Sequence, residues 1–332
     1  MKLYFPAYYN TFSCIAAACP DSCCKDWIVD VDPDAAAHYR ALGGDLGDHL
    51  RAVLQDTENG TVMEIANGRC PMWQQDGLCR IQAELGHDAL CKTCREFPRL
   101  RHDYGNFTDL DLELSCPEAA RLILNSDDSP CVQEAPGGES PDYDADAMTV
   151  LLRSRETVLT LLGNNSRSPA EALAILLLYA HDVQAEIDGF EPLPFEPDDI
   201  LQRAKKYAAS GDIDSIFALF RGLDILTQRW SSLLESVPKH IALKDRTLAL
   251  ARYFVRRYWL QSVSDLDLIC RVKFIITACL MINAVGCDFV DIAHLFSKEI
   301  ENNTDNVDAI LDNAYTSPAL TDCNLLGILL GC

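Results

Sequence analysis

Hydrophobic residues recur every three or four positions through most of the chain after residue 144. This spacing gathers them on one face of an α-helix, so the pattern predicts a succession of packed helices. Ser168-Pro169-Ala170-Glu171 is a typical helix start, with a capping box and a proline at the first helical position. The expected helices cover 145–163, 169–189, 197–209, 213–236, 241–261, 264–284, 288–301 and 305–313.

The first 124 residues show shorter and more varied patterns. Residues 110–114 alternate between leucine and acidic side chains, as in a half-buried strand, and the aromatic-rich segment 3–13 is expected to be extended. Asp32-Pro33-Asp34 and Cys116-Pro117-Glu118 each carry the signals of a helix start.

Residues 125–143 divide these two parts. They contain three prolines, Gly137-Gly138 and several acids but no base, which is typical of a linker. The sequence therefore predicts a mainly α protein. A cysteine-rich, metal-binding N-terminal region with little strand (1–124) precedes the linker (125–143) and an α-helical domain (144–332).

Nine of the fifteen cysteines lie between residues 14 and 116, mostly at close spacing. Such a group indicates disulfides or a metal site. Cys131 lies in the expected linker, so it is excluded from the ligand set. The candidate metal ligands are Cys14, Cys19, Cys23, Cys24, Cys70, Cys79, Cys91, Cys94 and Cys116.

Compartment decides between these two chemistries. The first residues contain no apolar run long enough for a signal peptide, and no stretch approaches the ~18 apolar residues that span a membrane. We therefore expect a cytoplasmic protein with no membrane partner. Thiols stay reduced in the cytoplasm, which favours a metal over disulfides.

The spacing of the cysteines alone does not determine which metal they bind. A structural zinc site usually takes two Cys-x2-Cys pairs, and only Cys91 and Cys94 form one. An iron–sulfur cluster accepts less regular spacings, and the Cys-Pro pairs at residues 70 and 116 favour it weakly. A redox-active pair at Cys91 and Cys94 is a third reading.

Charge narrows the class of partner. The chain carries 28 basic and 50 acidic side chains, a net charge of −22, so it repels phosphate and is not expected to bind nucleic acid. A basic or lysine-bearing partner is easier to accommodate, although acidity also simply keeps a protein soluble.

Other signals are weak. No Walker loop, dinucleotide fingerprint or nucleophile elbow occurs. Arg95, Arg99 and Arg101 could hold the carboxylate or phosphate of a cofactor, or form salt bridges on an acidic surface. His87 and His102 flank the cysteines and read as surface histidines rather than metal ligands.

The cysteine region resembles that of a known family. Its motifs, in chain order, are Pro6-x-Tyr8, Phe12-x-Cys14, Cys19, Cys23-Cys24-x2-Trp27, Cys70-Pro71-x5-Gly77-Leu78-Cys79-x-Ile81, Cys91-x2-Cys94-Arg95-x-Phe97-Pro98-Arg99 and Ser115-Cys116-Pro117-Glu118-Ala119-Ala120-Arg121. Together they resemble the flagellin lysine N-methylase (FliB) family, whose cysteine region is related to the YkgJ-type cysteine cluster. The resemblance covers residues 1 to about 124.

The resemblance implies a protein-lysine N-methyltransferase that acts on flagellin before export and uses S-adenosylmethionine. It also implies an iron–sulfur cluster, 4Fe-4S rather than the zinc alternative. Methyl transfer needs a neutral amine, and aromatic rings can hold a lysine ammonium before it loses its proton. Weak candidates for such a slot, which could equally be packing residues, are Tyr4, Tyr8, Tyr9 and Trp27.

Two rival functions remain open from the residues alone. One is a metal-storage or metal-delivery protein, in which the cysteines are the functional part. The other is a redox-sensing module that binds a partner according to the state of its metal centre. A bound methyl donor would distinguish the enzyme from both.

Overall fold

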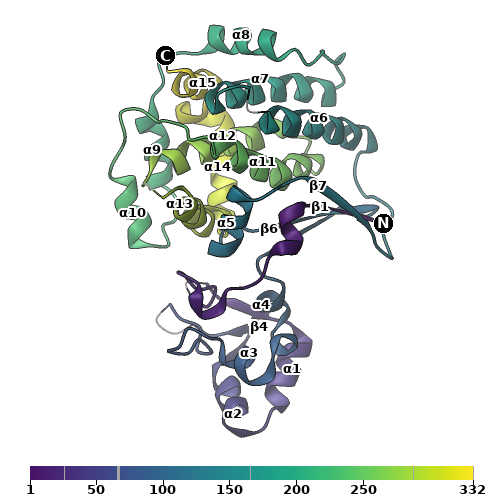
Figure 1. Cartoon of the computed structure of the whole chain (residues 1–332), viewed down its shortest axis with the longest axis vertical. Coiled ribbons are helices and arrows are strands. Elements are labelled where there is room, and N and C mark those ends of the chain that lie inside the picture. The colour runs from purple at the N-terminus through teal and green to yellow at the C-terminus, as the bar shows by residue number, and fades with distance from the viewer. Residues whose placement is uncertain (26, 66–67, 165, 287, 332) are drawn as a thin grey trace.

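The protein consists of a large helical body and a small lobe that projects from it (Figure 1). The computed structural model describes residues 1–25, 27–65, 68–164, 166–286 and 288–331. Helices account for 57% of the structure and strands for 11%, so the predicted mainly α class is confirmed. No described helix is long and apolar enough to cross a membrane.

Helices packed around one core make up most of the body. α12 is its central element: every residue from Leu268 to Ile282 is buried, which explains why its sequence is apolar on all sides. α12 packs against α7, α11 and α14. The body helices are α5 (Pro117–Asn125), α6 (Ala145–Gly163), α7 (Pro169–Ile187), α8 (Pro197–Tyr207), α9 (Ile213–Arg221), α10 (Gln228–Leu234), α11 (Thr247–Tyr258), α12 (Leu268–Ala284), α13 (Phe289–Phe296), α14 (Thr304–Thr316) and α15 (Asp322–Leu330).

Local capping explains where these helices begin. The Ser168 side chain accepts a hydrogen bond from the Glu171 amide at the start of α7, as the capping box predicts. Asp267 and Thr321 cap α12 and α15 in the same way. The sequence pattern missed α15, whose apolar residues form a run rather than a stripe.

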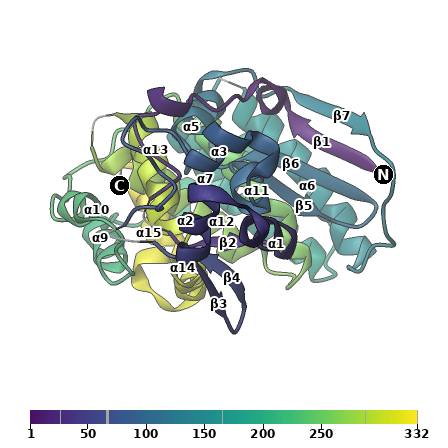
Figure 2. The same cartoon turned by 90° about the horizontal axis from the view of Figure 1, so that it is seen from below.

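A four-stranded sheet covers one side of the body. Its strand order is β5-β6-β1-β7, with β1 parallel to β6 and antiparallel to β7, and β5 antiparallel to β6 (Figure 2). Phe107 and Leu112 of this sheet belong to the same hydrophobic core as the helices. The strands are β1 (Lys2–Pro6), β5 (Arg99–Asp103), β6 (Phe107–Leu112) and β7 (Pro130–Glu134).

Strand β7 lies inside the segment 125–143, which the sequence indicates as a linker. All five of its residues pair with β1, from Lys2 opposite Glu134 to Pro6 opposite Pro130. A proline fits there because β7 is an edge strand, whose outward amides need no partner. Part of the expected linker is therefore an ordered part of the body.

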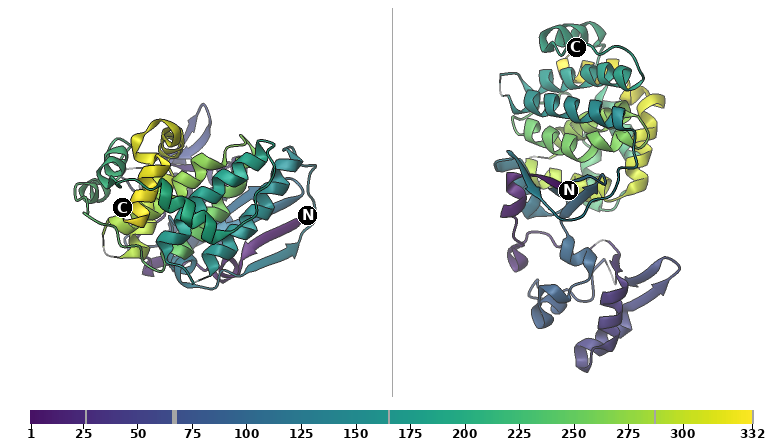
Figure 3. Two further views of the ribbon diagram at one scale, coloured as in Figure 1. Left: turned by 90° about the horizontal axis from the view of Figure 1, so that it is seen from above. Right: turned by 90° about the vertical axis from the view of Figure 1, so that its right-hand side faces the viewer.

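The small lobe (residues 22–97) is an insertion between β1 and β5. The chain leaves the body after β1 and a short 3-10 helix (Ala7–Thr11), and it returns at β5. Figure 3 shows the lobe standing apart from the helical body. The lobe has its own core around Tyr39, Leu50 and Met72. Its elements are β2 (Val29–Val31), α1 (Pro33–Ala41), α2 (Gly44–Val53), β3 (Leu54–Thr57), β4 (Gly60–Met63), α3 (Arg80–Leu85) and α4 (Lys92–Glu96).

Strands are thus concentrated in the first 134 residues, more than the sequence indicated. The second sheet has the order β2-β4-β3 and packs within the lobe. β6 and β1 overlap the segments 110–114 and 3–13, which the sequence indicated as strand-like or extended. The other strands have three to five residues each, too short to stand out as alternating patterns. The structure divides the chain between two cores, and the first of these joins segments from both ends of the sequence.

Candidate functional site

Thiols from separate loops meet in the small lobe. The Cys70 amide donates a 2.7 Å hydrogen bond to the Cys24 carbonyl, which brings their two loops together. The neighbouring Cys23 thiol, and after it the Cys70 thiol, lower the pKa of Cys24 to about 3, and the Cys70 thiol lies 3.5 Å from the Met63 sulfur. Cys24 thus lies next to thiols from its own loop and from the loop of Cys70.

The Cys-x2-Cys pair forms the neighbouring part of this group. Cys91 is the N-cap residue of α4, and Cys94 lies in its first turn, so both sulfurs point to the same end of the helix. The hydrogen bond from the Cys94 thiol lowers the pKa of Cys91 to about 7. Burial raises the pKa of Cys79, which lies at the start of α3. The nearby Cys24 and Cys91 raise it further.

Three further thiols lie where the lobe joins the body. Burial raises the pKa of Cys116, the N-cap residue of α5, to about 11, with smaller contributions from Cys19 and Cys14. Cys23 connects the two groups because it also lies near Cys14 and Cys116. All nine cysteines are free thiols in the structure.

The donor chemistry fits a thiolate-held metal centre. Soft sulfur ligands select zinc or iron–sulfur clusters, and here reduced sulfurs converge from four segments of the chain. Within the described residues, no three His, Cys, Asp or Glu side chains are already arranged to hold a metal ion. The sulfurs therefore gather as a hydrogen-bonded thiol group, and their side chains would have to turn to take up ligand geometry.

The predicted aromatic slot is divided between the two cores. Tyr8 is buried in the body, where its hydroxyl donates a 2.5 Å hydrogen bond to Asp111. Tyr9 packs beside Phe5, and Tyr4 lines a cavity of the body. Trp27 lies in the lobe, where its indole donates to the Cys23 carbonyl.

The arginines next to the Cys-x2-Cys pair are engaged locally. Arg95 donates to the Leu90 carbonyl at 3.4 Å. The Arg99 guanidinium lies 5.2 Å from the ring centre of Phe12. Neither Arg95 nor Arg99 lines the cavity between the four-stranded sheet and helices α6 and α11. Arg101 forms an ion pair with Asp103.

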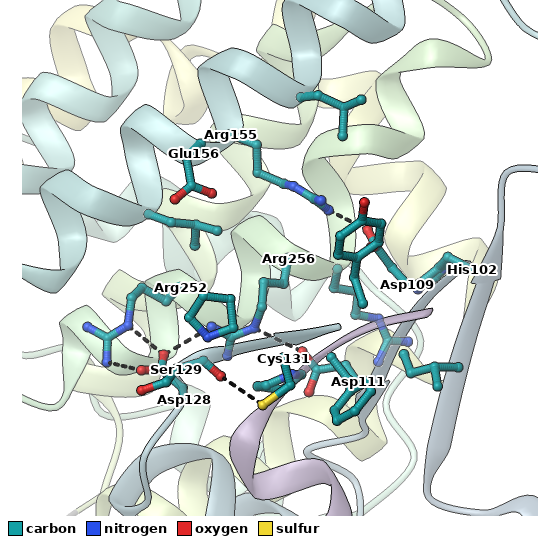
Figure 4. A pocket seen from close by; sticks show the side chains of 18 of the residues that line it. His102, Asp109, Asp111, Asp128, Ser129, Cys131, Arg155, Glu156, Arg252 and Arg256 are labelled. Carbon is teal, nitrogen blue, oxygen red and sulfur yellow. Dashed lines mark hydrogen bonds and ion pairs between the residues drawn. The ribbon is translucent and has the colours of Figure 1, made fainter. Parts of the chain in front are cut away.

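A cavity of about 480 Å³ lies between the four-stranded sheet and helices α6 and α11 (Figure 4). Its wall carries a buried network of charges. Arg256 donates to Asp111, to Asp128 and to the Tyr8 hydroxyl, each at 3.0 Å. Arg252 donates to both carboxylate oxygens of Asp128, including the one that Arg256 uses, and to the Leu162 carbonyl.

His102 also lines this cavity, contrary to its reading as a surface histidine. Burial lowers the pKa of His102, so the imidazole is neutral at pH 7, and its Nε2 has no hydrogen-bond partner. No sequence pattern indicated this cavity, because Asp111 and Arg256 are 145 residues apart. The only available signal was the row of three arginines on one predicted helix, at residues 252, 256 and 257.

Fold and site together define a class: a helical protein whose sheet carries an inserted lobe rich in free thiols. Comparison with known proteins places it further. The chain is 37% identical over 139 residues to the flagellar biosynthetic protein FliU of Salmonella muenchen, which is 39% of this chain and 80% of FliU. It is 35% identical over 136 residues to the lysine-N-methylase of Salmonella typhimurium, which is 39% of this chain and 34% of that protein.

The lysine-N-methylase of Salmonella choleraesuis matches to the same extent. The chain belongs to the flagellin lysine N-methylase family. It spans only about a third of the length of the lysine-N-methylases it matches. No family model matches the chain, and no solved structure does.

Proposed function

We propose that this protein transfers methyl groups from S-adenosylmethionine to lysine ε-amines of flagellin, and that its thiols hold an iron–sulfur cluster. The observation that carries the proposal is the similarity to FliU and to proteins named lysine-N-methylase. The free thiols that converge in the small lobe support the metal centre. The ligands are drawn from the nine cysteines between Cys14 and Cys116, with 4Fe-4S as the expected form and zinc as the alternative.

A cluster held by four thiolates supplies structural organisation and local electrostatics to the residues around it. The lobe's own residues make it dependent on such support. Its core is small, and its sheet has strands of only three or four residues. Cys24 and Cys91, whose pKa values are lowered by neighbouring thiols, are the sulfurs best prepared to act as anionic ligands.

The chain's own residues also suit a lysine-bearing protein substrate. The net charge of −22 attracts a basic segment and speeds its encounter. Lysine must lose a proton before it can attack a methyl group, and its ordinary pKa is about 10.4. Removal of the lysine side chain from water favours the neutral amine over the charged ammonium.

The test is a methyl-transfer assay under anaerobic conditions. Purified protein is incubated with flagellin and S-adenosylmethionine labelled in the methyl group, with its metal centre intact or removed by a chelator. The proposal expects label on flagellin lysines only with the intact centre. If the protein binds no donor and transfers no label, the metal-delivery alternative takes its place.

A further inference from the structure

Two consecutive residues of α6 present opposite charges to the cavity of the body. Arg155 and Glu156 both line it, and Figure 4 shows both side chains reaching from α6 into it. Among the described residues, only Nη1 of Arg155 is engaged, by Asp109. No hydrogen bond or ion pair of the described residues engages the exposed carboxylate of Glu156.

The other arginines of the cavity have no such free edge. Arg257 is engaged by the Tyr253 hydroxyl and by the carboxylates of Glu113 and Glu301. All three nitrogens of the Arg256 guanidinium donate to Asp111, Asp128 and Tyr8. Those of Arg252 donate to Asp128 and to the Leu162 carbonyl. An anionic ligand therefore finds its open donors at Arg155, because binding elsewhere would break a buried ion pair.

The sheet supplies a wall of mixed polar and aromatic side chains, in which one buried nitrogen has no hydrogen-bond partner. In the strand register His102 is opposite Asp109 and Asp109 is opposite Tyr4, so the three side chains form one row across β5, β6 and β1. All three line the cavity, together with Phe107 and, from α6, Leu159. The buried Nε2 of His102 completes this wall without a hydrogen-bond partner.

We propose that this cavity binds a ligand through a zwitterionic α-amino-acid head group, whose carboxylate lies on Arg155 and whose ammonium lies on Glu156. One α-carbon holds both charges a few ångströms apart, and adjacent residues of one helix present the two complements. The rest of the ligand lies along Tyr4, Phe107 and Leu159. A volume of about 480 Å³ suits a small organic molecule.

If the proposed function holds, this ligand is the methyl donor S-adenosylmethionine, whose methionine part carries the head group. The identification of the ligand rests on that function. A lysine side chain of the substrate is the competing occupant. It carries an ammonium but no carboxylate, so it would use Glu156 and leave the free edge of Arg155 unused. The two occupants therefore differ in their dependence on Arg155.

Calorimetric titration of the full chain, purified anaerobically, tests the site. The probes are S-adenosylmethionine, methionine, adenosine and Nα-acetyl-lysine methylamide. The variants are Glu156→Gln, which removes an exposed charge, and Arg155→Lys, which keeps the ion pair with Asp109 but loses the fork. The matched controls are Glu191→Gln, in the exposed loop after α7, and Arg153→Lys, on the same helix but outside the cavity.

We expect each cavity variant to weaken binding of S-adenosylmethionine and methionine by about tenfold or more, since each loses a charge-assisted contact. The controls should bind as the wild type does, and adenosine should bind equally to all. Denaturant unfolding confirms that each variant is folded.

The outcomes separate this inference from the proposed function. If the wild type binds the donor and methylates flagellin while both cavity variants bind the donor normally, the inference fails and the function stands. If no methyl transfer occurs but methionine binds and the variants lose it, the amino-acid site stands and the function fails. Loss of lysine-amide binding alone in Glu156→Gln, with donor binding unchanged, also overturns the inference.

Discussion

At the scale of single residues, Arg256 is the side chain that joins the sheet to the helices. It comes from α11 and donates to Asp111 of β6, to Asp128 before β7 and to Tyr8 after β1. The ion-paired groups are mostly removed from water, with 15% of the Arg256 and 6% of the Asp111 side chain exposed. Loss of the guanidinium would leave buried carboxylates without a partner, which is costly.

We therefore expect Arg256→Met to lower the free energy of unfolding by about 3–5 kcal/mol in urea titrations. Arg153→Met is the matched control, because its ion pair with Glu186 leaves 56% of the arginine side chain exposed. Its effect should stay below about 1 kcal/mol. Equal effects of the two substitutions would contradict the structural role of Arg256.

His294 should make stability depend on pH. Burial lowers its pKa from 6.5 to about 4, although Asp21 and Asp291 oppose this shift, while Lys298 and Arg229 add to it. Its contact with Asp21 at 3.5 Å is therefore no ion pair at neutral pH. Between these two pKa values the unfolded chain binds a proton that the folded chain does not, so stability falls as the pH drops.

The contribution of neutral His294 to the free energy of unfolding is fully present above about pH 6.5. About 3 kcal/mol of it is lost as the pH falls to about 4. His294→Gln should remove this part of the pH dependence. The measurement is the free energy of unfolding of both proteins at several pH values in this range. Parallel curves for the two proteins would show that His294 is not responsible.

The sequence could reveal the cysteines but not the cavity, for a physical reason. The thiols stand out because their number and spacing are unusual in themselves. The charges around Arg256 look like ordinary surface residues until the fold brings together positions more than 100 residues apart. The four aromatic residues of the expected slot are neighbours in sequence, yet the chain's exit into the lobe places Trp27 in another core.

At the scale of elements, the helices were predictable because their signals are local. Apolar spacing, N-caps and prolines at first positions lie within the helix itself, and α6 matches its predicted bounds, 145–163. The expected helix at 213–236 is in fact two, α9 and α10, with residues 222–227 between them. Gly222 is the C-cap residue of α9, and its amide donates to the Leu219 carbonyl.

The sheet could not be read in the same way, since its pairing is remote. β1 pairs with β6, which lies more than 100 residues further along the chain. β7, the other partner of β1, lies in a segment whose prolines and glycines indicate a linker. Residues 125–143 supply an edge strand, where these residue types are tolerated. The inserted lobe could not be predicted from the sequence for the same reason. The pairing of β1 with β6 is what shows that the residues between them contain an insertion.

Helix α15 packs closely against the segment after α8 at Gly327. A Cβ on Gly327 would lie 2.1 Å from the Ala209 carbonyl oxygen, so Gly327→Ala must displace α15 from the segment after α8. We expect a loss of about 1–3 kcal/mol in the free energy of unfolding. Gly163→Ala, at the end of α6 with open space around it, is the control and should be neutral or slightly stabilising. A neutral Gly327→Ala would mean that α15 packs elsewhere.

At the scale of the whole molecule, two separate cores imply two levels of stability. The body's core contains most of the large buried side chains, whereas the lobe relies on a few apolar residues and its thiols. If the lobe holds a metal centre, removing the metal should loosen the lobe and leave the body folded. Hydrogen exchange after chelation should therefore rise within residues 22–97 and stay low in α7 and α12. A uniform rise, or none, would contradict this division.

The central claim is that the converging thiols hold an iron–sulfur cluster. Its most direct test is the visible absorbance of anaerobically purified protein, together with iron, zinc and acid-labile sulfide analysis, for the wild type, Cys24→Ser and Cys131→Ser. We expect broad visible absorbance with about four irons and four sulfides per chain in the wild type and in Cys131→Ser. Absorbance should be bleached in Cys24→Ser, because Cys24 lies at the centre of the thiol group. Stoichiometric zinc without sulfide in the wild type would contradict the account.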